Sequence, residues 1–171
     1  MLEVLPRLSE PMHKQKHYSE VYASIQSLLS ADTDWLAAMA TIISELHNAF
    51  ESFDWTGFYR VVRDEHLQIG PYQGGHGCLD IAFSRGVCGA AARTKKTQLV
   101  PDVEAFPGHI ACSSSTKSEI VIPVVSKTGE VLAVLDVDSD HLDAFDAIDQ
   151  HWLESICALY AMRYPMRPSV R

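Results

Sequence analysis

The sequence predicts a single α+β domain in which an antiparallel sheet is covered by N- and C-terminal helices on one face and carries ligand-binding loops on the other. Two observations support this fold class: apolar residues recur at helical spacing near both ends of the chain, and short β-type segments lie between them. A length of 171 residues, with no internal repeat or linker, fits one compact domain. Hydrophobic residues make up 47% and charged residues 21%, which is typical of a globular chain.

The helical spacing sets the predicted domain limits. Residues 1–13 contain two prolines and no sustained periodicity, so we expect an N-terminal arm that is either loose or packed on a neighbouring chain. The sequence therefore leaves open whether the protein forms a homodimer. Residues 14–164 form the predicted domain, and residues 165–171 form a C-terminal tail.

Two helices are predicted at the start of this domain. Apolar residues between Tyr18 and Leu29 recur at three- and four-residue spacing, which places them on one side of a helix. The second helix is expected to follow a cap at Asp32 or Thr33 and to carry an apolar stripe that begins at Trp35.

From Trp55 onward the pattern changes to short β-type segments. An antiparallel hairpin is predicted for WTGFYRVV and HLQIGPY, followed by CLDIAF and a short helix at GVCGAAART. Residues 101–118 show little periodicity, and loops of this length in compact domains are usually functional or disordered. A second strand pair is predicted for EIVIPVV and EVLAVLDVD, and a closing helix for 145–164.

The turn between the last two strands determines their register. A two-residue turn at Thr128 and Gly129 would pair Lys127 with Glu130. Pro123 cannot donate a hydrogen bond in the ladder, so a bulge there would shift the register by one residue.

This register brings three acidic side chains together. It sets Glu119 opposite Asp138 and Val121 opposite Asp136, with all four side chains on one face of the sheet. Crowded carboxylates raise one another's pKa, so one can hold a proton and act as an acid while the others bind a cation such as an ammonium group. The alternative is that Asp136 and Asp138 end a strand at a solvated turn.

Cys112 is the candidate nucleophile. It lies in GHIACSSSTKSE, a loop of small polar residues, close in sequence to His109 and Lys117, and a nearby positive charge favours the thiolate. The alternative is an inert thiol, although free cysteines usually occur in cores. Cys78 and Cys88 both lie beside glycines, and either could resolve an oxidised Cys112.

The fourth cysteine is expected to have a structural role, and two cysteines together with nearby histidines could instead bind a metal. Cys157 lies in SICALY within the closing helix, so we assign it to the core. A zinc site is the alternative for His76, Cys78, His109 and Cys112, which form an H-x-C and an H-x-x-C pair. Because paired C-x-x-C knuckles are missing, we expect no metal and no other cofactor.

Trp55 and Tyr59 lie four residues apart, and therefore on one side of a regular strand. Most such aromatic residues belong to a core. Aromatic walls also suit a methylthio group, because sulfur and methyl groups pack well against rings.

Charge and hydropathy exclude several classes of partner. Lys and Arg number 14 against 22 Asp and Glu, so nucleic acids and anionic membranes would be repelled on average. No apolar run approaches the roughly 20 residues that a spanning helix needs, and the opening residues lack the apolar core of a signal peptide. We expect a cytoplasmic protein, where a reducing compartment keeps cysteines as thiols.

Several segments resemble the free methionine-(R)-sulfoxide reductases, which are GAF-domain enzymes. They are DWTGFY, GPYQG, CLDIAFSRGVCG, GHIAC, SEIVIPVV and GEVLAVLDVDS, within about residues 18–162. The set GHIAC, SEIV and LDVDS is far more specific than a generic GAF match. The resemblance implies a GAF-like fold, with Cys112 as the attacking cysteine, Cys78 as the main resolving cysteine and Cys88 as a secondary thiol of the disulfide relay.

The resemblance also implies a substrate site. By this resemblance, the polar end of the substrate is held by Glu119, Asp136 and Asp138. Its methyl group is enclosed by Trp55 and Tyr59. The expected reaction is reduction of free methionine sulfoxide through a cysteine sulfenic acid and an intramolecular disulfide, as a defence against oxidative stress. Selection of the R epimer follows from the resemblance alone.

Two further expectations concern partners and alternatives. Thioredoxin or a similar dithiol would restore the thiols by exchange. The alternative function is a non-catalytic GAF sensor module that binds a nucleotide-type small ligand, in which three loop cysteines would be superfluous.

Overall fold

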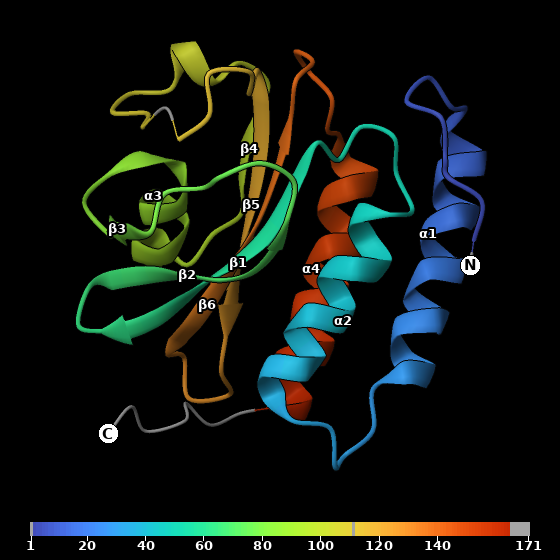
Figure 1. Ribbon diagram of the computed structural model, residues 1–171, viewed down its shortest axis with the longest axis horizontal. Helices are drawn as coiled ribbons and strands as arrows, with labels where there is room; N and C mark the ends of the chain where they lie inside the picture. Colours follow the sequence, from blue (N-terminus) through green and yellow to red (C-terminus); the bar gives the residue numbers. More distant parts are fainter. Residues whose placement is uncertain (1, 111, 165–171) are drawn as a thin grey trace.

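A six-stranded antiparallel sheet forms the centre of the computed structural model, which describes residues 2–110 and 112–164 (Figure 1). The strands follow the order β3-β2-β1-β6-β5-β4. Their bounds are β1 Trp55–Arg63, β2 His66–Gln73, β3 Asp80–Ala82, β4 Gln98–Val100, β5 Ser118–Val125 and β6 Val131–Ser139. The predicted α+β class is confirmed.

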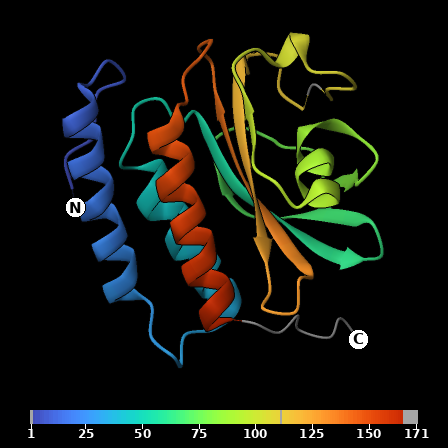
Figure 2. The same ribbon diagram turned by 180° about the vertical axis from the view of Figure 1, so that it is seen from behind.

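Helices cover the two faces of the sheet unequally. Three helices, α1 (Pro11–Leu28), α2 (Trp35–His47) and α4 (Ala147–Arg163), lie together on one face, whereas α3 (Gly86–Thr94) and the long loops lie on the other (Figures 1 and 2). No helix in the described part of the chain is long and apolar enough to cross a bilayer.

Each face of the sheet has its own apolar core. The larger core lies between the three helices and the sheet, and it contains Phe58, Ile120 and Leu135 from the central strands. The second core lies between the sheet and α3, and it contains Tyr59 and Val121. Because side chains alternate along a strand, successive residues of β1, β5 and β6 enter opposite cores.

The first helix begins earlier than the sequence predicts. It begins at Pro11, inside the predicted arm, because proline has no N–H and suits the first turn of a helix. The preceding chain is hydrogen-bonded to the domain: the Leu5 N–H donates to the Ala49 carbonyl, and the Glu51 N–H donates to the Leu5 carbonyl. The predicted tail, residues 165–171, lies outside the described residues.

A buried ion pair joins α1 to α4. Nζ of Lys14 contacts Oδ2 of Asp149, whose side chain is 2% exposed, and lies 2.9 Å from Oδ2 of Asp146. The Tyr18 hydroxyl donates to Oδ1 of Asp149 at 2.8 Å. Asp146 and Asp149 also form the capping box at the start of α4, so one group of side chains stabilises the helix end and the packing of α1.

One local prediction was wrong, and the predicted loop contains a short element that was not expected. The cap of α2 is Asp34, whose Oδ1 accepts hydrogen bonds from the Leu36 and Ala37 N–H groups, whereas the Thr33 hydroxyl accepts from the Ser30 N–H. The long loop is also preceded by β4 and interrupted by a 3-10 helix, η1 (Val103–Ala105). Elements of three residues are too short for a periodic pattern to be read from the sequence.

The β5–β6 turn differs from the prediction, but the register does not. The Ser126 N–H donates to the Glu130 carbonyl, so three residues form the turn rather than two. A bulge between Val124 and Val125 offsets the extra residue. Pro123 pairs with Val134 in the predicted register, at a point of β5 that β4 does not reach.

Candidate active site

Three neighbouring strands bring the predicted acidic residues together. Asp138 pairs with Glu119 of β5 on one side and with Trp55 of β1 on the other. Asp136 pairs with Val121 and with Gly57. The predicted crowding of Glu119, Asp136 and Asp138 on one face is therefore present.

These side chains line one cavity beneath α3 and the long loops. Its lining includes Trp55, Tyr59, Cys88, Cys112, Glu119, Asp136 and Asp138. About 40 Å³ of the cavity is open to the centre of a water molecule, which is room for a few waters. Seven of the eight residues singled out from the sequence thus share one hollow, and the eighth, Cys78, is covalently joined to it through Cys112.

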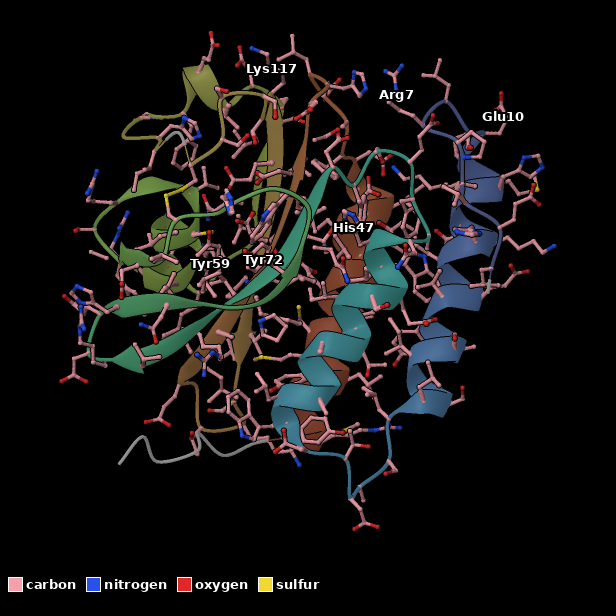
Figure 3. The ribbon with its side chains drawn as sticks, in the orientation of Figure 1. Arg7, Glu10, His47, Tyr59, Tyr72 and Lys117 are labelled. Atoms are coloured by element: carbon pink, nitrogen blue, oxygen red, sulfur yellow. A yellow bond between two sulfur atoms is a disulfide. The ribbon has the colours of Figure 1, made fainter. Side chains whose placement is uncertain are left out.

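A disulfide between Cys78 and Cys112 closes the loop side of the cavity (Figure 3). Their Cα atoms lie 5.2 Å apart, although 34 positions separate them in the sequence. Both residues are half-buried. The structure therefore represents the oxidised state, in which two long loops are tied together above the sheet.

Burial and mutual repulsion make the acidic side chains unusually basic. Burial raises the pKa of Asp136 to about 6. It also raises the pKa of Glu119 and of Asp138 well above the ordinary range of a carboxyl group, and the neighbouring acids raise both further. The cavity therefore has carboxyl groups that can hold a proton near neutral pH.

Cys88 lies directly against these acids. Its side chain, in the first turn of α3, is 4% exposed, and its Sγ lies 3.2 Å from Oδ2 of Asp136 and 4.0 Å from Oε1 of Glu119. Burial and the neighbouring carboxylates raise the pKa of its thiol well above the ordinary value. Cys88 is therefore a protonated hydrogen-bond donor in this state, unlike a reactive thiolate.

The other side of the cavity is aromatic. The rings of Trp55 and Tyr59 stack with centroids 5.8 Å apart, and the ring of Tyr72 also stacks with that of Trp55, at 5.5 Å (Figure 3 labels both tyrosines). Trp55 Nε1 donates to the Gly75 carbonyl at 3.1 Å and so holds the loop that leads to Cys78.

Two glycines make room for these rings. A Cβ atom at Gly57 would lie 2.3 Å from Cη2 of Trp55, and one at Gly77 would lie 2.8 Å from the Tyr59 hydroxyl. Neither glycine was predicted to belong to the site, because a glycine within a strand or loop does not show which side chain crosses it. Ile110 and Thr116 also line the cavity and were not predicted.

The positive charge expected beside Cys112 has another partner in the structure. Nζ of Lys117 lies 3.5 Å from Oε1 of Glu104, near the top of the view in Figure 3, and Lys117 is absent from the cavity lining. His109 does line the cavity, but burial lowers its pKa, so it is mainly neutral. Neither residue places a cation on Cys112 in the oxidised state.

Among the described residues, two groups combine side chains of the types that bind metals. The predicted alternative of His76, Cys78, His109 and Cys112 loses both sulfur ligands to the disulfide in this state. A different set, Cys88, Glu119 and Asp136, places one ligand atom from each residue within 4.8 Å of the others. Cys157 is buried in the larger core, as predicted.

The chain is similar to known proteins over most of its length. The GAF domain family matches residues 32–162. The free methionine-R-sulfoxide reductase of Saccharomyces cerevisiae is 38% identical over 157 residues, covering 88% of this chain and 87% of the yeast protein. GAF domain-containing protein A of Dictyostelium discoideum is 45% identical over 146 residues, covering 85% of this chain and 91% of that protein.

A solved structure extends the similarity to three dimensions. The X-ray structure of free methionine-R-sulfoxide reductase from Neisseria meningitidis in complex with its substrate has a TM-score of 0.85 and 40% identity. The similarity covers 96% of each chain.

Proposed function

We propose that this chain, which belongs to the GAF-domain family of free methionine-R-sulfoxide reductases, reduces free methionine-R-sulfoxide to methionine. One observation carries the proposal: the Cys78–Cys112 disulfide closes a cavity that has carboxyl groups on one side and stacked aromatic rings on the other. A dithiol that can be oxidised above such a cavity suits reduction of a small sulfoxide.

The cavity lining matches the parts of a free amino acid. The carboxylates of Glu119, Asp136 and Asp138 attract an α-ammonium group. The stacked rings of Trp55 and Tyr59 suit the methyl group on the sulfoxide sulfur. A methionine within a polypeptide has no α-ammonium group, so the acidic side of the cavity selects the free amino acid.

Substrate entry requires the loops to separate. The oxidised cavity has room for only a few waters, which is too little for methionine sulfoxide. Reduction of the disulfide releases the loops that carry Cys78 and Cys112 from each other. We therefore assign substrate binding to the dithiol state and the closed cavity to the state after turnover.

The chemistry begins at Cys112. Its thiolate attacks the sulfoxide sulfur while a protonated carboxyl group of the acidic side donates a proton to the sulfoxide oxygen. The oxygen passes to Cys112, so that methionine leaves and Cys112 becomes a sulfenic acid. The Cys78 thiol then attacks the sulfenic sulfur, which forms the disulfide and releases water.

An external dithiol completes the cycle. The Cys78–Cys112 disulfide is half-buried rather than enclosed, so a thiolate of thioredoxin or a similar protein can attack one sulfur and restore both thiols. This requirement favours a reducing compartment such as the cytoplasm.

The direct test offers four substrates with a dithiol reductant: the R and S epimers of free methionine sulfoxide and of a peptide-bound form. We expect turnover of the free R epimer, no turnover by Cys112→Ser, and full turnover by Cys157→Ser, whose replaced thiol lies in the distant core. Preference for the peptide, or turnover by Cys112→Ser, would overturn the proposal.

A further inference from the structure

We infer that Cys88, Glu119 and Asp136 form a binding site for a thiophilic divalent cation of the Zn²⁺ class, and that a bound cation blocks the cavity. The three residues come from different elements, α3, β5 and β6, yet one ligand atom from each lies within 4.8 Å of the others. This set differs from the histidine and cysteine pairs in the two loops.

The separations between ligand atoms suit a zinc ion. Sγ of Cys88 lies 3.2 Å from Oδ2 of Asp136 and 4.0 Å from Oε1 of Glu119. A tetrahedral zinc ion with Zn–S of about 2.3 Å and Zn–O of about 2.0 Å sets its sulfur and oxygen ligands about 3.5 Å apart. Small rotations of the side chains would therefore be enough for all three to bind one ion.

A buried atom without a partner points to a ligand at this place. Among the described residues, Oδ1 of Asp136 has no hydrogen-bond partner, although Asp136 is 5% exposed and lines the cavity. A buried carboxylate oxygen without a partner is costly, and a cation that contacts both oxygens of the Asp136 carboxylate would satisfy it.

The surrounding charge also favours a cation. The described cavity lining contains neither lysine nor arginine, so the carboxyl groups have no fixed positive partner there. Three protein ligands leave a fourth position open toward the cavity, where a water molecule would complete the tetrahedron. Binding displaces to solvent the Cys88 thiol proton and any proton held by the Glu119 or Asp136 carboxyl group, since the thiolate and the carboxylates are the metal ligands.

A cation at this site would compete with the substrate. This competition rests on the proposed function, in which the same carboxylates attract the α-ammonium group. Zn²⁺ at Asp136 and Glu119 would occupy that position, so inhibition should be competitive with methionine sulfoxide. Metal binding itself does not require any turnover.

The binding test uses Cd²⁺, because a cadmium–thiolate bond gives an ultraviolet charge-transfer band. The protein for this test carries Cys78→Ser and Cys112→Ser, which leaves only the thiols of Cys88 and Cys157 and lets the loops separate. We expect the band to saturate at one Cd²⁺ per chain. Adding Cys88→Ser should abolish the band, whereas adding Cys157→Ser should leave it unchanged.

The oxygen ligands are tested in the same protein. Asp136→Asn should weaken Cd²⁺ and Zn²⁺ at least tenfold in calorimetry, while Asp140→Asn, at an exposed acid beyond the end of β6, should have no effect. Absence of the band, or a band that Cys88→Ser leaves intact, would overturn the inference.

Activity of the unmodified, reduced protein separates the two proposals. Cd²⁺ binding at Cys88 in a protein that reduces no sulfoxide would reject the proposed function and keep the metal site. Sulfoxide turnover that saturating Zn²⁺ does not inhibit would reject the blocking role of the cation.

Discussion

The Cys88 thiol donates a hydrogen bond to Asp136, with Sγ 3.2 Å from Oδ2, across the contact between α3 and β6. This bond joins a cysteine to a carboxyl group of the cavity whose pKa is raised by burial to about 6. Cys88 therefore acts on the acidic side of the cavity, while Cys78 and Cys112 close the loop side.

Replacement of Cys88 should move the pH profile. Its hydrogen bond lowers the pKa of Asp136, so Cys88→Ala should raise that pKa and shift the alkaline limb of kcat/KM to higher pH by about half a unit. Cys88→Ser keeps a donor and should keep the limb in place. Identical limbs in the alanine and serine variants would show that the hydrogen bond has no such role.

The buried charge of Asp136 should cost stability at high pH. Its pKa rises from 3.8 to about 6 on folding, so the folded state holds the proton more tightly. The resulting stabilisation is complete below pH 4 and is lost as the pH rises through 6. Asp136→Asn should therefore increase the free energy of unfolding by about 1–2 kcal/mol at pH 8, and less at pH 5.

Urea denaturation of the oxidised protein at both pH values measures this effect. Asp140→Asn is the control, because Asp140 is exposed and its replacement should change stability little at either pH. A pH-independent difference between Asp136→Asn and the unmodified protein would contradict the prediction.

A methyl group at Gly57 should displace the aromatic wall. Its Cβ would lie 2.3 Å from the Trp55 ring and 2.7 Å from Cβ of Tyr72, so Gly57→Ala should destabilise the fold by about 1–3 kcal/mol and raise KM. Gly75→Ala is the matched control, because no atom lies within 4 Å of its added Cβ. Thermal unfolding, tryptophan fluorescence and KM measure the effect, and equal results for both variants would contradict it.

Loss of Lys14 should leave a buried charge on α4 without its partner. Lys14→Ala should reduce the free energy of unfolding by about 2–3 kcal/mol, because Asp149 is almost fully buried. Lys16→Ala, which removes an exposed pair with Glu20, should cost at most about 0.5 kcal/mol. Equal losses in denaturant titrations would show that the α1–α4 pair contributes no more than a surface pair.

Without Cys78, the reaction should stop after one oxidation. Cys78→Ser should release about one methionine per chain and accumulate a sulfenic acid at Cys112, because the resolving thiol is gone. Trapping with dimedone followed by mass spectrometry detects that species, and Cys157→Ser should show none. A Cys88–Cys112 disulfide in its place would contradict the prediction and assign the resolving step to Cys88.

Several features of this protein were predictable from the sequence because they depend on local periodicity. The alternation of β5 and β6 and the short turn between them determine that Glu119 and Asp138 face each other. The predicted register was right although the turn has three residues rather than the predicted two. The bulge at Val124 and Val125 compensates for the additional turn residue. The helices at both ends were predictable for the same reason.

Other features depend on contacts between distant segments. The residues alone left Cys78 and Cys88 as equal partners of Cys112, and only the resemblance favoured Cys78. The tertiary structure pairs Cys78 with Cys112 and turns Cys88 toward the acids instead. Likewise, Lys117 was expected to act on Cys112, but the fold brings it to Glu104.

The sequence by itself determined the α+β class, the strand register and the crowding of three acids, because each follows from spacing within one element or between adjacent strands. Only the tertiary structure decided which thiols meet, which carboxyl group Cys88 contacts and how small the closed cavity is. Those properties depend on how α3 and two long loops pack over the sheet, and that packing leaves no periodic signal in the chain.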